Sequence, residues 1–145
     1  MWFGMAVVTS PIQNWQLYST PWAWVPAIGL LGVGLWLYKA SSRSFSPKQL
    51  GGLHELAPQR HQQVLVTSGI RSRVRHPVYL AHVCEMLAWS VGTGLAVCYA
   101  LTLFAVLVGS LMVRMEEREL EKRMGSEYQT YRAAVPAILP RLWGS

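Results

Sequence analysis

The stretch LAVCYALTLFAVLVGSLMV, residues 95–113, decides the fold class of this chain. Its 19 residues carry no charge, and an α-helix needs roughly 20 apolar residues to cross the hydrocarbon core of a bilayer. The next segment, RMEERELEKRM (residues 114–124), is rich in charge, and Gly125 follows it as a helix-ending residue. The sequence therefore predicts a transmembrane helix that continues into a charged extension outside the membrane.

Two earlier stretches are also suited to a bilayer. Residues 78–91 contain only His82 and Glu85 as ionisable groups, and the Gly-Thr-Gly sequence after them allows only a tight turn before the next apolar stretch. Residues 21–38 are uncharged and have aromatic residues at both ends, as is typical of membrane–water boundaries. We therefore expect an all-α, polytopic membrane protein of about three spans, the last two forming a C-terminal helical hairpin.

Composition supports a membrane location. Hydrophobic residues make up 52% of the chain and charged residues 14%, against roughly 25% charged residues in soluble domains. The net charge of +6 would suit nucleic acid or an anionic membrane face, and the apolar background favours the membrane, so no nucleic-acid partner is expected. Cys84 and Cys98 lie in apolar stretches, and their spacing predicts neither a disulfide nor a metal site.

The distribution of basic residues predicts the orientation. With three spans, all 13 Lys and Arg residues fall on one side, in the loop 39–76 and the tail 114–141. The positive-inside rule places this side in the cytoplasm. Whether residues 1–18 also insert is left open. The chain is expected to form one domain, residues 1–145, with spans at about 21–38, 78–91 and 95–113 and functional motifs at 63–79 and 114–141.

Two charged motifs lie at the two ends of the predicted hairpin. In RHPVY, residues 75–79, Pro77 suits the first turn of a helix. RMEERELE, residues 114–121, begins where the last span leaves the bilayer. Each motif alone is also compatible with an ordinary interfacial helix start or a solvated, salt-bridged face. Because the ends of a hairpin lie at one membrane level, we expect five side chains to converge there: His76, Tyr79, Arg114, Glu116 and Glu117.

Two weaker patterns lie elsewhere. QVLVTSG, residues 63–69, predicts a short extended stretch closed by a glycine, whose backbone could bind a ligand edge, although a plain strand and turn is the simpler interpretation. In residues 125–132, the i, i+3, i+4 spacing of Tyr128, Tyr131 and Arg132 makes one amphipathic face. An interfacial helix lying on the lipid headgroups would account for it.

In this order, the motifs resemble the isoprenylcysteine carboxyl methyltransferase and phospholipid methyltransferase superfamily of integral membrane enzymes. The resemblance covers roughly residues 45–141 and implies a helical membrane fold with a cytoplasmic pocket for S-adenosylmethionine. It also implies a tunnel that delivers a lipophilic or prenylated acceptor from the bilayer. The matching sequences are LVTSG at 65–69, RHPxY at 75–79, RxEExxL at 114–120, MGxxYxxY at 124–131, and the pairs Val135-Pro136 and Leu139-Pro140.

The resemblance implies how the cofactor would be held. Carboxylates suit the ribose hydroxyls and the ammonium of S-adenosylmethionine, and a helix N-terminus at His76 suits its carboxylate. Tyr79 offers a hydroxyl, or a ring face for the sulfonium. The backbone of residues 63–65 would read the adenine edge. The cofactor-binding residues are expected to be Gln63, Val64, Leu65, Gly69, His76, Tyr79, Glu116 and Glu117.

Three residues are expected to act in catalysis: Arg114, Glu117 and Tyr128. Arg114 either holds an acceptor carboxylate by a bidentate contact or pairs with Glu117. A carboxylate acceptor is already ionised and needs no general base, whereas an amine acceptor needs one, and a glutamate or Tyr128 would then serve. The resemblance assigns no role to His82 and Glu85, which form either a pocket wall or a local packing pair.

Three alternatives to carboxyl O-methylation stay open at this point. One is N-methylation of a phospholipid amine. A second is a nicotinamide-dependent membrane reductase of the sterol type, for which the basic loop could bind a phosphorylated dinucleotide. A third is a non-catalytic membrane subunit that uses its basic face to bind anionic lipid or a partner. The identity of the acceptor and the oligomeric state are not determined by the sequence.

Overall fold

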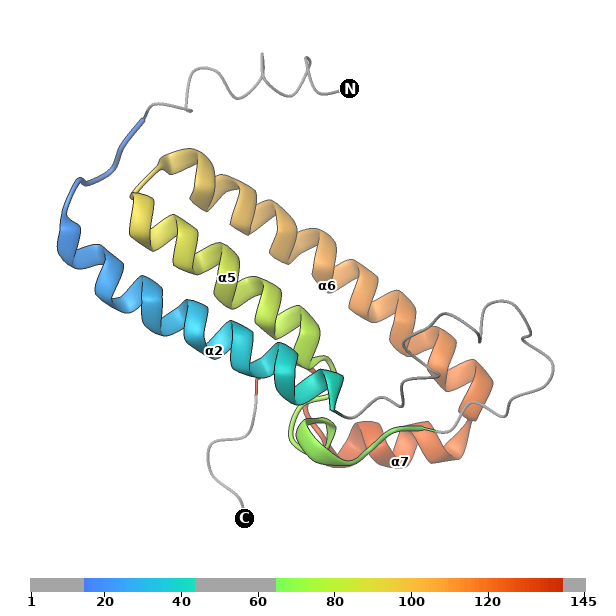
Figure 1. Cartoon of the computed structure of the whole chain (residues 1–145). Coiled ribbons are helices and arrows are strands. Elements are labelled where there is room, and N and C mark those ends of the chain that lie inside the picture. Colours follow the sequence, from blue (N-terminus) through green and yellow to red (C-terminus); the bar gives the residue numbers. More distant parts are fainter. Residues whose placement is uncertain (1–14, 44–64, 140–145) are drawn as a thin grey trace, which may run out of the picture. The chain divides into compact units, whose positions relative to one another are not determined.

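The computed structural model describes residues 15–43 and 65–139, and within these ranges it contains helices and no β-strand (Figure 1). The prediction of an all-α fold is therefore confirmed. Leu65 and Val66 have no regular secondary structure, while Gln63, Val64 and most of the segment 1–18 lie outside the described residues. The elements are η1 (Pro21–Ala23), α2 (Trp24–Ser42), η2 (Gly69–Ser72), α5 (Pro77–Thr93), α6 (Ala96–Met124) and α7 (Ser126–Ala134).

Two helical segments, Pro21–Ser42 and Ala96–Met124, are long and apolar enough to cross a membrane. In their most apolar windows only 22% and 11% of the residues are buried. A core helix of a soluble protein would be buried on most sides, whereas these helices expose large apolar side chains, as lipid-facing helices do. α6 also continues through the charged sequence to Met124, as predicted, and ends at Gly125, whose φ is 57°.

The third predicted span corresponds to α5, which has 17 residues. At 1.5 Å per residue this helix is about 26 Å long, a little short of the ~30 Å hydrocarbon core of a typical bilayer. The structure thus contains the predicted helix, with Pro77 as its first residue. Its passage through a membrane stays a prediction.

The chain divides into two compact units, which we describe separately. The apolar unit comprises the described part of Met1–Leu35 together with Ala81–Arg114. Here α2 approaches α5 closely at Gly34, where a Cβ atom would lie 3.1 Å from Cγ of Glu85. α5 and α6 are joined by a two-residue connection, and Oγ of Ser90 lies 2.9 Å from Oγ1 of Thr102. Small residues and paired hydroxyls are the usual contacts of helices in lipid.

Residues just before η1 close the connection between α5 and α6. Leu17 N donates to Gly94 O at 2.8 Å, and the hydroxyl of Tyr18 donates to Val91 O at 2.8 Å. Gly94 has a φ of 65° and faces the backbone of Tyr18, so only glycine fits there. A depression of about 500 Å³ nearby is lined by polar and apolar residues, none of them ionisable, so it lacks the groups that acid–base or charge recognition needs.

The charged unit comprises Trp36–Leu80 and Met115–Ser145, of which residues 36–43, 65–80 and 115–139 are described. Its C-terminal segment pairs with the residues before α5: Arg75 N donates to Pro136 O at 3.0 Å and His76 N to Ala137 O at 2.9 Å. Tyr128 packs inside this unit with only 1% of its surface exposed. The tyrosine face of α7 thus packs inward.

Candidate functional site

Three charged or ionisable residues are buried together in the charged unit. Arg75, His76 and Glu117 are only 7%, 6% and 8% exposed. Such residues are rarely buried unless they are paired. Here Arg75 donates from Nη2 at 2.5 Å and from Nε at 3.0 Å to Oε1 of Glu117, and Nε2 of His76 lies 3.2 Å from the same oxygen. A single carboxylate oxygen therefore receives three contacts.

Arg75 connects this carboxylate to the end of α7. Its Nη1 donates to the carbonyl of Arg132 at 2.8 Å and also to the carbonyl of Val135. Carbonyls at a helix C-terminus lack partners in the helix and carry partial negative charge, so they suit a guanidinium. Arg75 thus fixes the positions of Glu117 and the C-terminal end of α7 at once.

The role of Arg75 was not anticipated from the sequence, although the residue belongs to the RHPVY motif. One feature of the sequence nevertheless indicates that Arg75 needs an acidic partner. Arg75 stands just before the N-terminus of α5, where the helix dipole disfavours a positive charge. Such a cation needs a compensating acid, and the chain has few acids to supply it, seven in all.

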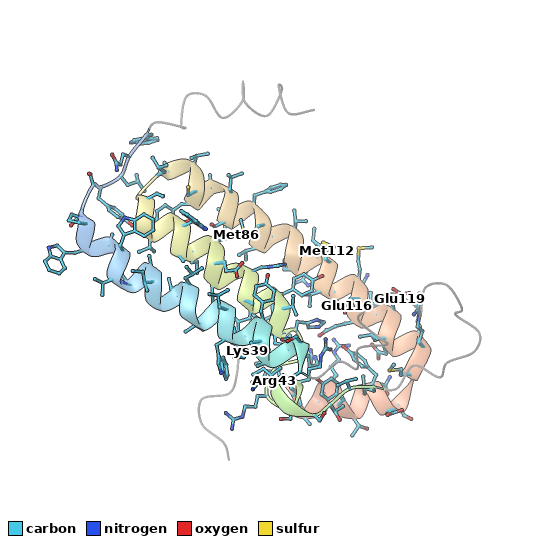
Figure 2. The ribbon with its side chains drawn as sticks, viewed as in Figure 1. Lys39, Arg43, Met86, Met112, Glu116 and Glu119 are labelled. Atoms are coloured by element: carbon cyan, nitrogen blue, oxygen red, sulfur yellow. The ribbon has the colours of Figure 1, made fainter. Side chains whose placement is uncertain are left out.

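Two more of the expected ligands lie beside His76. Its Nδ1 is 3.6 Å from Oε2 of Glu116, and its ring meets the ring of Tyr79 edge to face, with centroids 5.9 Å apart. The Glu116 side chain is 48% exposed and lies on α6, one turn beyond Met112 (Figure 2). The structure therefore brings together His76, Tyr79, Glu116 and Glu117.

The remaining expected cofactor ligands are less well defined. Leu65 is half-buried in irregular backbone. Gly69 begins η2 with a φ of 64°, and its carbonyl accepts a local hydrogen bond from Ser72 at 2.8 Å. Within the described residues no hydrogen bond joins Leu65 or Gly69 to Glu117. Gln63 and Val64 lie outside the described residues.

Glu117 is held in its ionised form. Burial alone would raise the pKa of this carboxyl, but hydrogen bonds from Arg75 and His76, together with their charges, outweigh burial and leave the pKa lowered. Its second oxygen, Oε2, has a longer contact, 3.8 Å to Nε of Arg132. The charged cluster, formed by Arg75, His76, Glu117 and Arg132, thus presents a fixed carboxylate with one tightly held oxygen and one loosely held oxygen.

Arg114 lies on α6, three residues before Glu117 in sequence, and is exposed. The ion pairs of Glu117 are formed by Arg75, His76 and Arg132. The bracing role that the i,i+3 spacing left open for Arg114 is therefore filled by Arg75. Arg114 stays available for other contacts.

Tyr128 contributes a buried hydroxyl for which the described residues provide no hydrogen-bond partner. Burial, followed by the nearby Glu117 carboxylate, raises the pKa of this phenol to about 12. Tyr128 therefore keeps its proton at neutral pH and can donate a hydrogen bond. The same high pKa disfavours the role of general base considered for it.

Comparison with known proteins finds two curated relatives that match part of the chain. The chain is 36% identical over 85 residues to Protein-S-isoprenylcysteine O-methyltransferase of Xenopus laevis, which is 55% of this chain and 28% of that protein. It is also 36% identical over 84 residues to the cobalt-zinc-cadmium resistance protein CzcN of Cupriavidus metallidurans, which is 57% of this chain and 38% of that protein. The similarity to isoprenylcysteine methyltransferases inferred from the motifs is thus confirmed, over about a third of each relative's length.

No solved structure matches the chain significantly. A family model, in contrast, matches nearly the whole sequence, residues 2–135. This match includes every helix of the structure and all members of the charged cluster. The chain therefore belongs to the family described as "Protein of unknown function (DUF1295)".

Proposed function

We propose that this protein is an integral membrane methyltransferase that uses S-adenosylmethionine to methylate the carboxylate of a lipophilic, prenyl-like acceptor. The observation that carries the proposal is the state of Glu117. Its Oε1 is fixed by Arg75 and His76, while its Oε2 has a single longer contact, to Arg132. A buried, ionised carboxylate with one loosely held oxygen is suited to recognise a cation or a pair of hydroxyls.

The residues of the cluster fit this cofactor. When bound, S-adenosylmethionine supplies a methyl group on a sulfonium. Glu116 and Glu117 would accept hydrogen bonds from its ribose hydroxyls and ammonium, and His76 would contact its carboxylate. Tyr79 lies against His76 and would offer its hydroxyl or its ring face. The buried hydroxyl of Tyr128 provides a further donor.

The acceptor is inferred from the groups that could serve it. An amine acceptor needs a general base, and Tyr128, with a pKa of about 12, is poorly suited to that role. A carboxylate acceptor needs no base, and the exposed Arg114 guanidinium can bind one in bidentate fashion. The relative named Protein-S-isoprenylcysteine O-methyltransferase supports a prenylated carboxylate as the acceptor.

The proposed placement in the membrane has three spans. α2 and α6 would cross, and α5 would form a hairpin with α6, so that the basic residues face the cytoplasm. A cysteine at Ser126 should then react with an impermeant thiol reagent only after the membrane is opened. The matched control is a cysteine at Ser19, which should react in intact cells. The opposite pattern would reverse the orientation.

Transfer of a labelled methyl group is the direct test. Protein purified in detergent is incubated with labelled S-adenosylmethionine and an S-prenylated cysteine that has a free carboxylate. The corresponding prenyl-cysteine amide is the matched acceptor control, because it keeps the lipid and removes the reacting oxygen. Label should enter the free acid and not the amide.

Cofactor binding is measured on the same samples by isothermal titration. A folded protein that gives no heat with millimolar S-adenosylmethionine would contradict the methyltransferase proposal as a whole. Binding of the cofactor without transfer to the prenylated acid would contradict only the acceptor. Heat with a nicotinamide dinucleotide instead would favour the reductase alternative.

A further inference from the structure

One face of α6 changes from apolar to cationic along its length. Its members repeat at intervals of three and four residues, which places them within roughly 80° of one another around the helix. The apolar members are 57–69% exposed, and the two basic members are exposed as well. In chain order they are Phe104, Leu107, Leu111, Met115, Arg118 and Lys122.

Arg118 and Lys122, which we call the cationic pair, lack partners among the described residues. They are four residues apart on a helix, a spacing at which like charges repel. The hydrogen bonds and ion pairs of the described residues include neither side chain. Neither side chain therefore forms an ion pair within the described residues.

The acids of α6 already contact other basic residues. The nearest candidates for the cationic pair, Glu119 and Glu121, are bound by Arg123 and Arg132. Gln129 also donates to Glu121 at 2.9 Å. The other two acids of the helix, Glu116 and Glu117, contact His76 and Arg75. None of these four carboxylates forms an ion pair with Arg118 or Lys122 in the described residues.

The rest of the sequence offers little compensation. Of the seven acids of the chain, three lie outside α6: Glu55, Glu85 and Glu127. Segment 44–64, outside the described residues, contains Lys48 and Arg60 against Glu55, so that its own formal charge is +1 (two cations minus one acid). That segment is a poor partner for two further positive charges. Within the described residues, Arg118 and Lys122 therefore have no anionic partner.

We propose that the cationic pair binds the phosphate groups of anionic phospholipids in the leaflet around this end of α6. Met115, the last apolar member of the face, lies one turn before Arg118, so the cations begin where the apolar face ends. At that level a lipid-exposed helix meets headgroups, and juxtamembrane basic residues attract anionic lipids. The inference rests on the membrane placement proposed above and not on methyl transfer.

The test measures lipid preference directly. The full-length protein in detergent micelles is titrated with phosphatidylglycerol and phosphatidylcholine of equal chain length, and retained lipid is counted by native mass spectrometry. We expect wild-type protein to prefer phosphatidylglycerol by on the order of tenfold. Arg118→Gln/Lys122→Gln should reduce this preference to less than about threefold, and added salt should weaken the wild-type preference.

Arg123→Gln is the matched control for Arg118→Gln. Both residues are exposed arginines on α6, but Arg123 is already paired with Glu119. The control should keep the wild-type preference, and Arg118→Gln should lose part of it. An unchanged preference in the double variant, or equal effects of the two single variants, would overturn the inference.

Two further measurements on the same samples separate the remaining outcomes. If glycerol phosphate displaces the lipid at equal concentration, the surface binds free phosphate and the lipid assignment is wrong. If lipid preference follows the cationic pair while no methyl transfer or cofactor binding is found, the lipid surface stands and the methyltransferase proposal falls. Circular dichroism confirms that each variant remains helical.

Discussion

In the described part of the apolar unit, two side-chain pairs join neutral hydroxyl groups, whereas a buried side-chain pair of the charged unit joins two ions. Ser90 meets Thr102 through two hydroxyls 2.9 Å apart, and Tyr18 meets Tyr99 in the same way at 2.7 Å. In the charged unit, Arg75 and Glu117 form a pair in which both side chains are about nine-tenths buried. Placing a pair of hydroxyl groups in lipid costs little free energy, whereas burying an ion pair carries a large desolvation cost.

This difference supports the placement of the proposed site in the charged unit. Stability alone does not require the buried ion pair, because a well-packed apolar substitute is often equally stable. A site that must hold a carboxylate in one position does require it, since the cation fixes both charge state and geometry. The apolar unit contains a single acidic residue, Glu85. Because Gly34 has no side chain, space is left beside the side chain of Glu85.

The strongest way to break the contrast is to remove one partner of the ion pair. Arg75→Ala leaves Glu117 buried without its main cation and should lower the free energy of unfolding by about 3–5 kcal/mol. The measurement is denaturant unfolding in mild detergent. Arg123→Ala removes an arginine from an exposed pair and should cost less than about 1 kcal/mol. Similar small losses for both variants would mean that the buried pair is not structurally important.

A second change keeps the shape of the site and removes its charge. Glu117→Gln should weaken cofactor binding by about 1.5–3 kcal/mol, the usual scale for a hydrogen bond to a charged group. Glu119→Gln is the control, because position 119 points about 200° away from 117 around the helix. Isothermal titration compares the two, and equal losses would indicate a diffuse charge effect in place of a defined site.

A third change tests whether Arg114, the last residue of the apolar unit, binds the acceptor while Arg75 of the charged unit braces Glu117. Arg114→Lys keeps the charge but loses the planar fork that binds a carboxylate. Because Arg75 already braces Glu117, cofactor affinity should hold within about threefold. Turnover should fall at least about tenfold, near 1.4 kcal/mol in the barrier. Weakened cofactor binding with unchanged saturated turnover would remove Arg114 from acceptor recognition.

The smallest effect is expected in the apolar unit. Thr102→Val removes the hydroxyl that meets Ser90 and keeps the branched shape, so stability should fall by about 0.6 kcal/mol, as for typical interhelical hydrogen bonds in membranes. Ser110→Ala is the control, since that hydroxyl bonds Leu107 of its own helix. A loss at Thr102 as large as that for Arg75→Ala would erase the contrast between the units.

The sequence predicted the helices well, because their signals are local. The charge-free run at 95–113 and the charged run after it correspond to one continuous helix, and Pro77 begins α5, as expected of a proline suited to the first turn of a helix. The close approach of His76, Tyr79, Glu116 and Glu117 followed from the placement of two motifs at adjacent helix ends.

The pairing within the site could not be read in the same way. Local spacing made Arg114 a candidate partner of Glu117, but the structure uses Arg75, 42 residues away in sequence. The backbone of Arg75 pairs with Pro136, a long-range contact that no periodicity encodes. For the same reason, the tyrosine face of α7 was interpreted as lying on headgroups, whereas Tyr128 is buried.

The contacts of Arg75 also have a consequence for the order of biosynthesis. Its partners Glu117, Arg132 and Val135 follow it by 42, 57 and 60 residues. Under the membrane placement proposed above, the guanidinium would be unpaired while the ribosome is still translating those codons, and an unpaired juxtamembrane cation opposes translocation. Only after the last apolar helix has been made can Glu117 neutralise it. Under that placement, Arg75 would act first on the topology of the nascent chain and later, through its contacts with Glu117 and the end of α7, on the architecture of the finished site.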